Sequence, residues 1–126
     1  MGIFTHNCVG TNDLSRAGQF YDAALAPLGI ARLGAFLDQG LSYGTKAAEF
    51  LVLKPEDGAT ATPGNGITIG FKATSRAAVD AFHAAGLAAG GTDAGPPGPR
   101  NAVIHAYGAY LHDPDGNKIC AYCFKA

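Results

Sequence analysis

Apolar positions in the first half of the chain follow two spacings. Between residues 14 and 28 they recur at steps of three and four, which is the spacing of one face of an α-helix. Asn12 and Asp13 precede this run and are good capping residues, while residues 27–29 (Pro-Leu-Gly) are typical of a helix end. The apolar positions are Leu14, Ala17, Phe20, Tyr21, Ala24, Leu25 and Leu28. The pattern predicts an amphipathic helix whose inner face is aromatic and aliphatic.

Extended segments flank this predicted helix. Residues 3–9 predict a first strand, in which His6 and Cys8 share one face because side chains alternate along an extended backbone. Turn residues such as Gly, Asp and Lys separate the extended pieces that follow the helix. These pieces cover residues 30–37, 41–44 and 48–53.

The same order of strand and helix returns 62 residues later. Residues 67–73 predict a strand, Ser75 caps a helix, and the glycines at 90 and 91 end it. The predicted apolar stripe of this second helix is Val79, Phe82, Gly86 and Leu87. With the single offset of 62, Phe20 aligns with Phe82, Ala23 with Ala85, Leu25 with Leu87 and Gly29 with Gly91. A repeat of this size predicts two related modules, each of which must bury an apolar face.

The two modules belong to one predicted domain. Module one covers residues 1–53, residues 54–66 form a connector without apolar periodicity, and module two covers residues 67–126. Each module reads as strand, helix and up to three strands. We therefore expect an α+β fold of two βαβββ modules with mixed sheets, whose helix-free faces come together and enclose a cleft.

The second half of module two contains a segment rich in proline and glycine. Residues 92–101 (TDAGPPGPRN) are expected to form no regular structure, and they read either as a lid or as a stiff connector. Residues 103–111 and 118–124 predict a hairpin around the turn at residues 112–117. His112 opens this turn and is expected to be solvated.

Charge and motifs exclude several classes of function. The formal net charge is -1 and no basic patch is present, so nucleic acid and anionic membranes are not expected partners. The sequence also lacks the signatures of serine hydrolases, P-loop enzymes, zincins and Rossmann oxidoreductases. We see no export signal and no apolar run of about 18 residues. A cytoplasmic protein with three reduced cysteines is therefore expected.

Two short motifs have a structural interpretation that we favour over a chemical one. Cys120 and Cys123 form a CxxC string within a predicted strand, where their sulfurs point to opposite faces. We therefore expect two buried or half-buried thiols and no redox pair. Asp113, Asp115 and Asn117 alternate as in a calcium loop, but the other EF-hand ligands are missing. We expect a hairpin turn there.

Four segments together resemble one known superfamily. They are residues 20–29 (FYDAALAPLG), 75–91 (SRAAVDAFHAAGLAAGG), 95–100 (GPPGPR) and 113–119 (DPDGNKI). In this order the chain is similar to the vicinal-oxygen-chelate superfamily, which includes glyoxalase I, bleomycin-resistance proteins and extradiol dioxygenases. The resemblance covers nearly the whole chain. It implies paired βαβββ modules around a cleft, in which a divalent metal chelates the substrate through neighbouring oxygens.

The metal ligands that the resemblance implies are largely replaced. His6 matches the histidine of the first strand, whereas Thr68 stands at the second histidine position. Leu51 and Cys120 stand at the closing-strand positions of the two modules, and the second of these is normally Glu. A catalytic metal needs about three protein donors. We therefore expect a degraded site and no cofactor.

Zinc is the alternative cofactor, because it is softer than Mg²⁺ or Mn²⁺ and accepts thiolate ligands. It would bind if His6 and Cys120 faced each other across the cleft, with help from Cys8 or Glu49. In that case the resemblance implies a lyase, isomerase or dioxygenase that uses His6 as ligand or base. Tyr107 is then a candidate general acid.

The main hypothesis is metal-independent binding of a small molecule. An aromatic or amphipathic compound would lie between Tyr43, Phe50 and Tyr107, near Cys120. Arg100 either anchors an anionic group of the ligand or binds a loop carbonyl, and the sequence leaves both open. A homodimer is also expected, because relatives in the superfamily often pair modules across chains.

Overall fold

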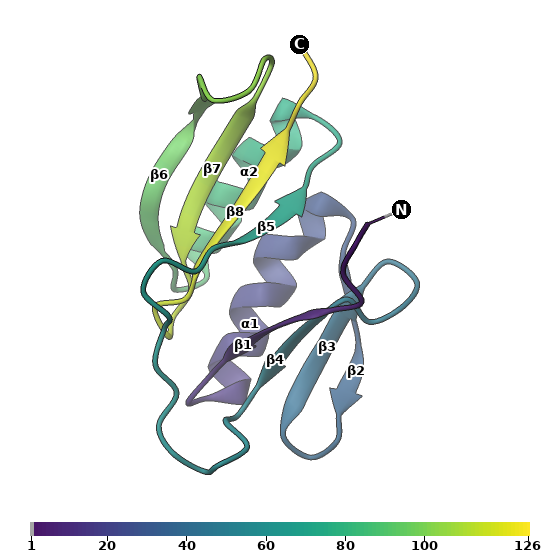
Figure 1. Ribbon diagram of the computed structural model, residues 1–126, viewed down its shortest axis with the longest axis vertical. Coiled ribbons are helices and arrows are strands. Elements are labelled where there is room, and N and C mark those ends of the chain that lie inside the picture. Colours follow the sequence, from purple (N-terminus) through teal and green to yellow (C-terminus); the bar gives the residue numbers. More distant parts are fainter. Residues whose placement is uncertain (1) are drawn as a thin grey trace.

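The computed structural model describes residues 2–126 and shows two βαβββ modules joined by a connector (Figure 1). The first module consists of β1 (Asn7–Gly10), α1 (Leu14–Leu25), the 3-10 turn η1 (Ala26–Leu28), β2 (Ala31–Phe36), β3 (Gly40–Gly44) and β4 (Phe50–Leu53). The second consists of β5 (Ile69–Lys72), α2 (Arg76–Ala88), β6 (Thr92–Pro99), β7 (Tyr107–His112) and β8 (Lys118–Cys123).

Each module builds its own four-stranded sheet with the same strand order. The orders are β1-β4-β3-β2 and β5-β8-β7-β6. The first and last strands of each module pair in parallel, and the other neighbours are antiparallel, so both sheets are mixed. The predicted α+β fold of two βαβββ modules is confirmed.

Both helices begin at the residues that the sequence indicated. The Asp13 side chain accepts a hydrogen bond from the backbone N–H of Arg16, and Ser75 accepts one from Ala78. These bonds satisfy N–H groups that have no partner within the helix. Gly29 follows η1 with a φ of 75°, a left-handed conformation that favours glycine. Among residues 2–126, no helix is long and apolar enough to cross a membrane.

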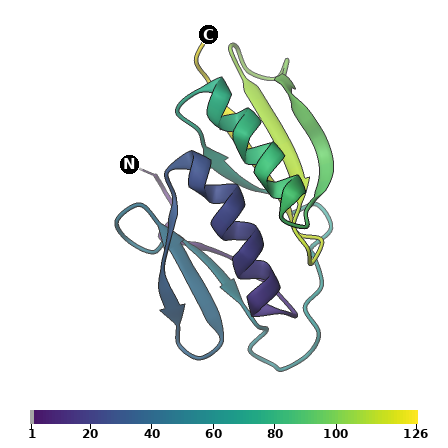
Figure 2. The same ribbon diagram turned by 180° about the vertical axis from the view of Figure 1, so that it is seen from behind.

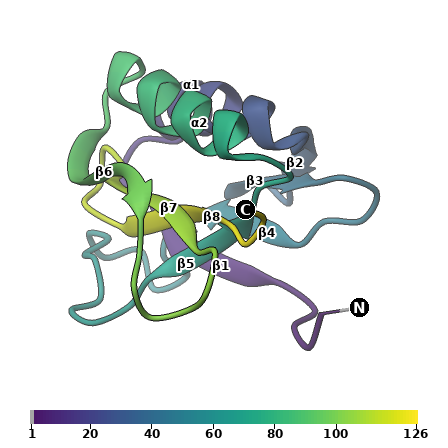
Figure 3. The same ribbon diagram turned by 90° about the horizontal axis from the view of Figure 1, so that it is seen from above.

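The modules meet through their helix-covered sides. Helices α1 and α2 lie side by side in one layer, with the strands in a second layer (Figures 2 and 3). Across the junction, the rings of Phe50 on β4 and Phe71 on β5 pack edge to face with centroids 5.1 Å apart. One apolar core therefore serves both modules. The expectation that the helix-free faces would come together is wrong for this chain, because the rings that join the modules, Phe50 and Phe71, belong to the core under the helices.

A buried polar cluster also joins the modules. The Tyr21 hydroxyl of α1 donates to Asp113 Oδ2 of the second module at 2.6 Å, and Thr11 donates to Asp115 Oδ2 at 2.6 Å. Arg16 forms an ion pair with Asp115 at 3.0 Å. The turn after β7 is therefore tied to α1 and to Thr11, which precedes it.

The expectation that residues 92–101 form no regular structure is also wrong, because β6 covers Thr92–Pro99. This strand lies at the edge of its sheet and pairs only with β7. Its register shifts between Asp93 and Gly95 and again between Gly95 and Gly98. Prolines cannot donate to a ladder and are tolerated in edge strands and at bulges, which is where they occur here.

Two smaller expectations also change. The first strand begins only at Asn7, so Ile3 and His6 lie before it and are exposed. Leu87 is 41% exposed and does not belong to the inner stripe of α2, whereas Val79 and Phe82 are fully buried.

Candidate functional site

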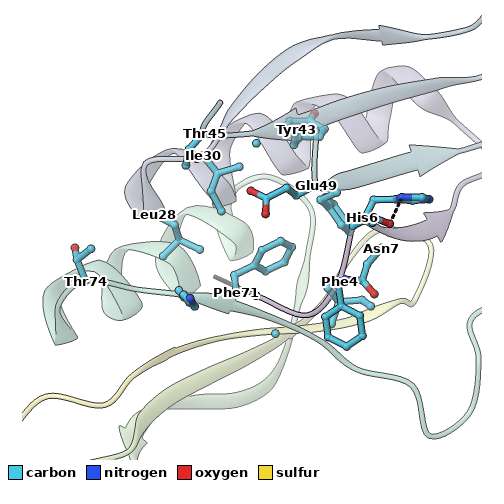
Figure 4. Close-up of a pocket in the computed structure, with 17 residues that line it drawn as sticks. Phe4, His6, Asn7, Leu28, Ile30, Tyr43, Thr45, Glu49, Phe71 and Thr74 are labelled. Atoms are coloured by element: carbon cyan, nitrogen blue, oxygen red, sulfur yellow. Dashed lines mark hydrogen bonds between the residues drawn. The ribbon is translucent and has the colours of Figure 1, made fainter. Parts of the chain in front are cut away.

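A cavity of about 460 Å³ opens between the two modules, and we call it the inter-module cavity (Figure 4). Both modules line it. The first contributes residues before and at the start of β1, Leu28 and Ile30, and parts of β3 and β4 with the loop between them. The second contributes β5 and Thr74. Its size falls within the usual range for small-molecule sites.

The wall of the inter-module cavity is aromatic and aliphatic. Its rings come from Tyr43, Phe50 and Phe71, and its aliphatic residues include Leu28 and Ile30. The centroids of Phe50 and Phe71 are 5.1 Å apart, and those of Tyr43 and Phe50 are 6.3 Å apart. These residues belong to or pack against the shared core, so the cavity is a place where the core reaches the surface.

The Tyr43 hydroxyl already has a partner on α1. It donates to Asp22 Oδ1 at 2.9 Å. Burial raises the pKa of Tyr43, and the hydrogen bond to Asp22 raises it further. Tyr43 therefore stays protonated at neutral pH, and its fully buried side chain supports the aromatic wall from within the core.

Polar side chains line the same cavity around the aromatic wall. Glu49 is exposed, and Figure 4 shows its carboxylate on the side of the cavity where Phe71 lies. Lys72 contributes a positive charge. His6 also lines the cavity, but its ring is turned away from Phe71 and its Nδ1 lies 3.0 Å from the Thr5 hydroxyl. The cavity thus combines an apolar wall with charges of both signs.

The side chains present do not fit the metal site that the resemblance implies. Within residues 2–126, no three His, Cys, Asp or Glu residues lie close enough together to hold an ion. His6 is exposed at the inter-module cavity, whereas Cys120 does not line it. Leu51 and Thr68 stand at the other two positions and supply no strong donor. We therefore derive no step through a metal.

Cys120 lies on β8 next to Gly70 of β5. A Cβ atom placed on Gly70 would lie 3.3 Å from the Cys120 sulfur, so the thiol fills the space that this glycine leaves. Burial raises the pKa of Cys120 to about 11. Its neighbour in the CxxC string, Cys123, is also a buried free thiol. The prediction of two buried thiols is confirmed.

Arg100 and Tyr107 lie outside the inter-module cavity. The Arg100 guanidinium donates to the carbonyls of Pro96, Gly98 and Pro99, as the loop-carbonyl interpretation expected. Tyr107 donates to Asp80 at 2.6 Å, and this hydrogen bond raises its pKa. The roles of Arg100 as anion anchor and of Tyr107 as general acid stay predictions. Of the other predicted site residues, Tyr43, Phe50, His6 and Glu49 line the cavity.

Sequence reasoning missed several residues of this cavity. Phe71, Ile69 and Lys72 of β5 line it, together with Leu28 and Ile30. The alternation of Ile69 and Phe71 marked a buried strand face. Nothing local showed that this face would meet the first module.

Comparison with solved structures places the chain in a family. A glyoxalase/bleomycin resistance protein from Albidiferax ferrireducens T118 is 48% identical to it, with a TM-score of 0.87. The match covers 96% of this chain and 98% of the other. The chain belongs to the glyoxalase/bleomycin resistance protein family. No protein-family model matches the chain, and no curated protein does.

Solved structures of lower sequence identity share the fold. A glyoxalase-related enzyme from Fulvimarina pelagi is 19% identical over 97% of this chain and 88% of its own, with a TM-score of 0.73. A glyoxalase/bleomycin resistance protein/dioxygenase family enzyme from Burkholderia phytofirmans PsJN is 19% identical over 94% of this chain and 95% of its own, with a TM-score of 0.72. At this identity the likeness concerns the fold alone.

Proposed function

We propose that this family member binds a small, mainly aromatic molecule in the inter-module cavity without a metal ion. The observation that carries the proposal is a cavity of about 460 Å³ in which the partly exposed ring of Phe71 lies against the buried ring of Phe50, with Tyr43 behind it. Apolar walls with a few polar groups are typical of ligand sites. The polar groups here are Glu49 and Lys72, which would orient a ligand that carries one or two hydrogen-bonding groups.

Several sides of the cavity are already fixed before a ligand arrives. Phe50 is 3% exposed and contacts Phe71 edge to face, and Tyr43 is held by its bond to Asp22. A ligand therefore does not have to order these rings, and the entropy cost of binding is small. A planar aromatic compound matches such a wall, because aromatic pairs gain stability from offset or edge-to-face contact.

The metal-dependent alternative has weaker support. It needs a third donor beside His6 and Cys120, and no group of three such donors lies together within residues 2–126. Homodimer formation and a cytoplasmic location stay predictions that rest on the resemblance and the composition.

A neutral fluorescent probe tests the proposal. N-phenyl-1-naphthylamine is apolar and aromatic, and its emission rises when it leaves water. We expect saturable binding to the wild-type protein. Thr45 is exposed and lines the cavity, so Thr45→Trp should obstruct it and weaken probe binding about tenfold or more, the equivalent of about 1.4 kcal/mol.

A matched control separates obstruction from a general effect of tryptophan. Thr60 lies in the connector, is exposed and lines no cavity described here, so Thr60→Trp should bind the probe as the wild type does. Circular dichroism confirms that both variants fold. Equal affinity in the wild type and Thr45→Trp would place the probe elsewhere and contradict the proposal.

A further inference from the structure

A second cavity of about 500 Å³ lies between the connector and the end of the second sheet where β7 turns into β8. Residues 63–68 form one wall, and His112, Gly116 and Lys118 form the other. Figure 1 shows the connector passing beside the turn that joins β7 to β8. This connector cavity shares no lining residue with the inter-module cavity.

The geometry points to a site for a small anion in the connector cavity, with a phosphate or carboxylate group as the chemistry recognised. Two basic residues, His112 and Lys118, stand directly opposite each other in the antiparallel register of β7 and β8. No Asp or Glu is among the lining residues. The charge of the cavity therefore has one sign.

The positive charge of Lys118 is available to a ligand. Among residues 2–126, Lys118 takes part in no ion pair. Its ammonium lies 5.1 Å from the centroid of the Tyr110 ring, a cation–π contact that holds the side chain over the sheet. An ammonium group so placed keeps its hydrogen-bond donors for an anion.

The carboxylates of the second module have other partners, and none within residues 2–126 forms an ion pair with Lys118. Asp80 accepts from Tyr107, and Asp93 binds His83. Asp113 and Asp115 are bound to residues of the first module through Tyr21, Thr11 and Arg16. The acidic groups nearest in sequence to His112 thus face the junction between modules.

Neutral donors complete the lining. Thr68 and Asn65 line the cavity, and within residues 2–126 their side chains make no hydrogen bond, nor does the His112 ring. Each has hydrogen-bonding capacity left for a ligand. Thr68 stands where the family resemblance implies a histidine, so this change of residue replaces a metal donor with a neutral hydroxyl.

The connector wall is fixed in place at two points. Asn12 holds Ala61 by two hydrogen bonds, from its Nδ2 to the Ala61 carbonyl and from the Ala61 N–H to its Oδ1. Pro63 packs against Gly116, where an added Cβ atom would lie 3.3 Å from the proline ring. The volume exceeds the need of an inorganic ion and has room for a small organic phosphate or carboxylate.

Titration of the whole chain tests this inference. Inorganic phosphate and citrate are added separately at constant ionic strength, and binding is followed by calorimetry and by backbone amide chemical shifts. We expect saturable shifts centred on Gly66, Thr68 and His112, and the stronger of the two probes identifies the anionic group. Uniform small shifts across the surface, or no saturation with either probe, would overturn the site.

A charge-matched pair of variants completes the test. Lys118→Gln should weaken binding of the preferred anion about tenfold or more, because a charge-assisted hydrogen bond is lost. Lys46 lies in the exposed turn before β4 and lines neither cavity, so Lys46→Gln should bind like the wild type. Equal losses in both variants would show a nonspecific effect of net charge and reject the site. The shift map on the wild-type protein decides the matter if Lys118→Gln does not fold.

Discussion

Removing one oxygen atom from Tyr21 tests whether the buried polar cluster holds the modules together. Tyr21 is fully buried, and its hydroxyl donates to Asp113 at 2.6 Å. Asp113 is only 4% exposed and has two donors at each carboxylate oxygen. In Tyr21→Phe the ring keeps its packing, while one of these four hydrogen bonds is lost.

The size of the effect follows from the charge and burial of the acceptor. A hydrogen bond to a charged group contributes about 1.5 to 3 kcal/mol, and water cannot easily replace the hydroxyl beside a carboxylate this deeply buried. We therefore expect Tyr21→Phe to lower the free energy of unfolding by about 2 kcal/mol. With a urea slope of about 2 kcal/mol per molar for a chain of this length, the midpoint falls by about 1 M.

Tyr43→Phe is the matched control. This ring is also fully buried, but its hydroxyl donates to Asp22, whose side chain is 48% exposed. Water can take the place of the lost donor there, so a loss of about 0.5 to 1 kcal/mol is expected. The chain has no tryptophan, and far-UV circular dichroism is the natural probe of urea unfolding.

The comparison of the two variants decides the question. Equal losses in Tyr21→Phe and Tyr43→Phe would refute the reasoning that burial of the acceptor sets the magnitude. A loss below about 0.5 kcal/mol in Tyr21→Phe would mean that the cluster does not stabilise the junction.

Two further predictions concern ionisation and thiol reactivity. Burial, and next the charge of Asp113, raise the pKa of Tyr21 above its usual value. The contribution of the Tyr21 hydroxyl to the free energy of unfolding is therefore complete below about pH 10, where an unfolded tyrosine ionises, and is lost at higher pH. The stability difference between wild type and Tyr21→Phe should therefore narrow from pH 9 to pH 11 in urea titrations; a difference that widens contradicts this sign. Cys8 is exposed, whereas Cys120 and Cys123 are buried, so Ellman's reagent at pH 8 should modify one thiol per chain rapidly. Cys8→Ser should abolish that rapid phase, and its persistence would show that a buried thiol is accessible.

Local signals predicted the helices well. Asp13 and Ser75 cap α1 and α2 as expected, because a capping bond involves residues only three apart. The turn between β7 and β8 also follows from local chemistry, since Gly116 adopts a φ of 89° there.

Strand β6 shows where local reasoning fails. Its prolines and glycines favour an irregular segment, and nothing in their spacing shows that β7 will pair with them. A strand rich in proline and glycine is tolerated here because it lies at the sheet edge and contains two register shifts. Both features belong to the assembled sheet and are not encoded locally. Among the residues that line the inter-module cavity, the sequence indicated Tyr43, Phe50, His6 and Glu49. It did not predict that Phe71 of the second module would lie beside them.

The sequence alone determined that two similar modules exist, because the offset of 62 residues repeats both the helix pattern and its end. It did not determine which faces of the modules meet. That depends on close packing between distant residues: a Cβ on Gly91 would lie 2.5 Å from the Phe20 ring, and Phe50 lies against Phe71. An apolar pattern shows that a face is buried, whereas only the shapes of the side chains that meet decide what covers it.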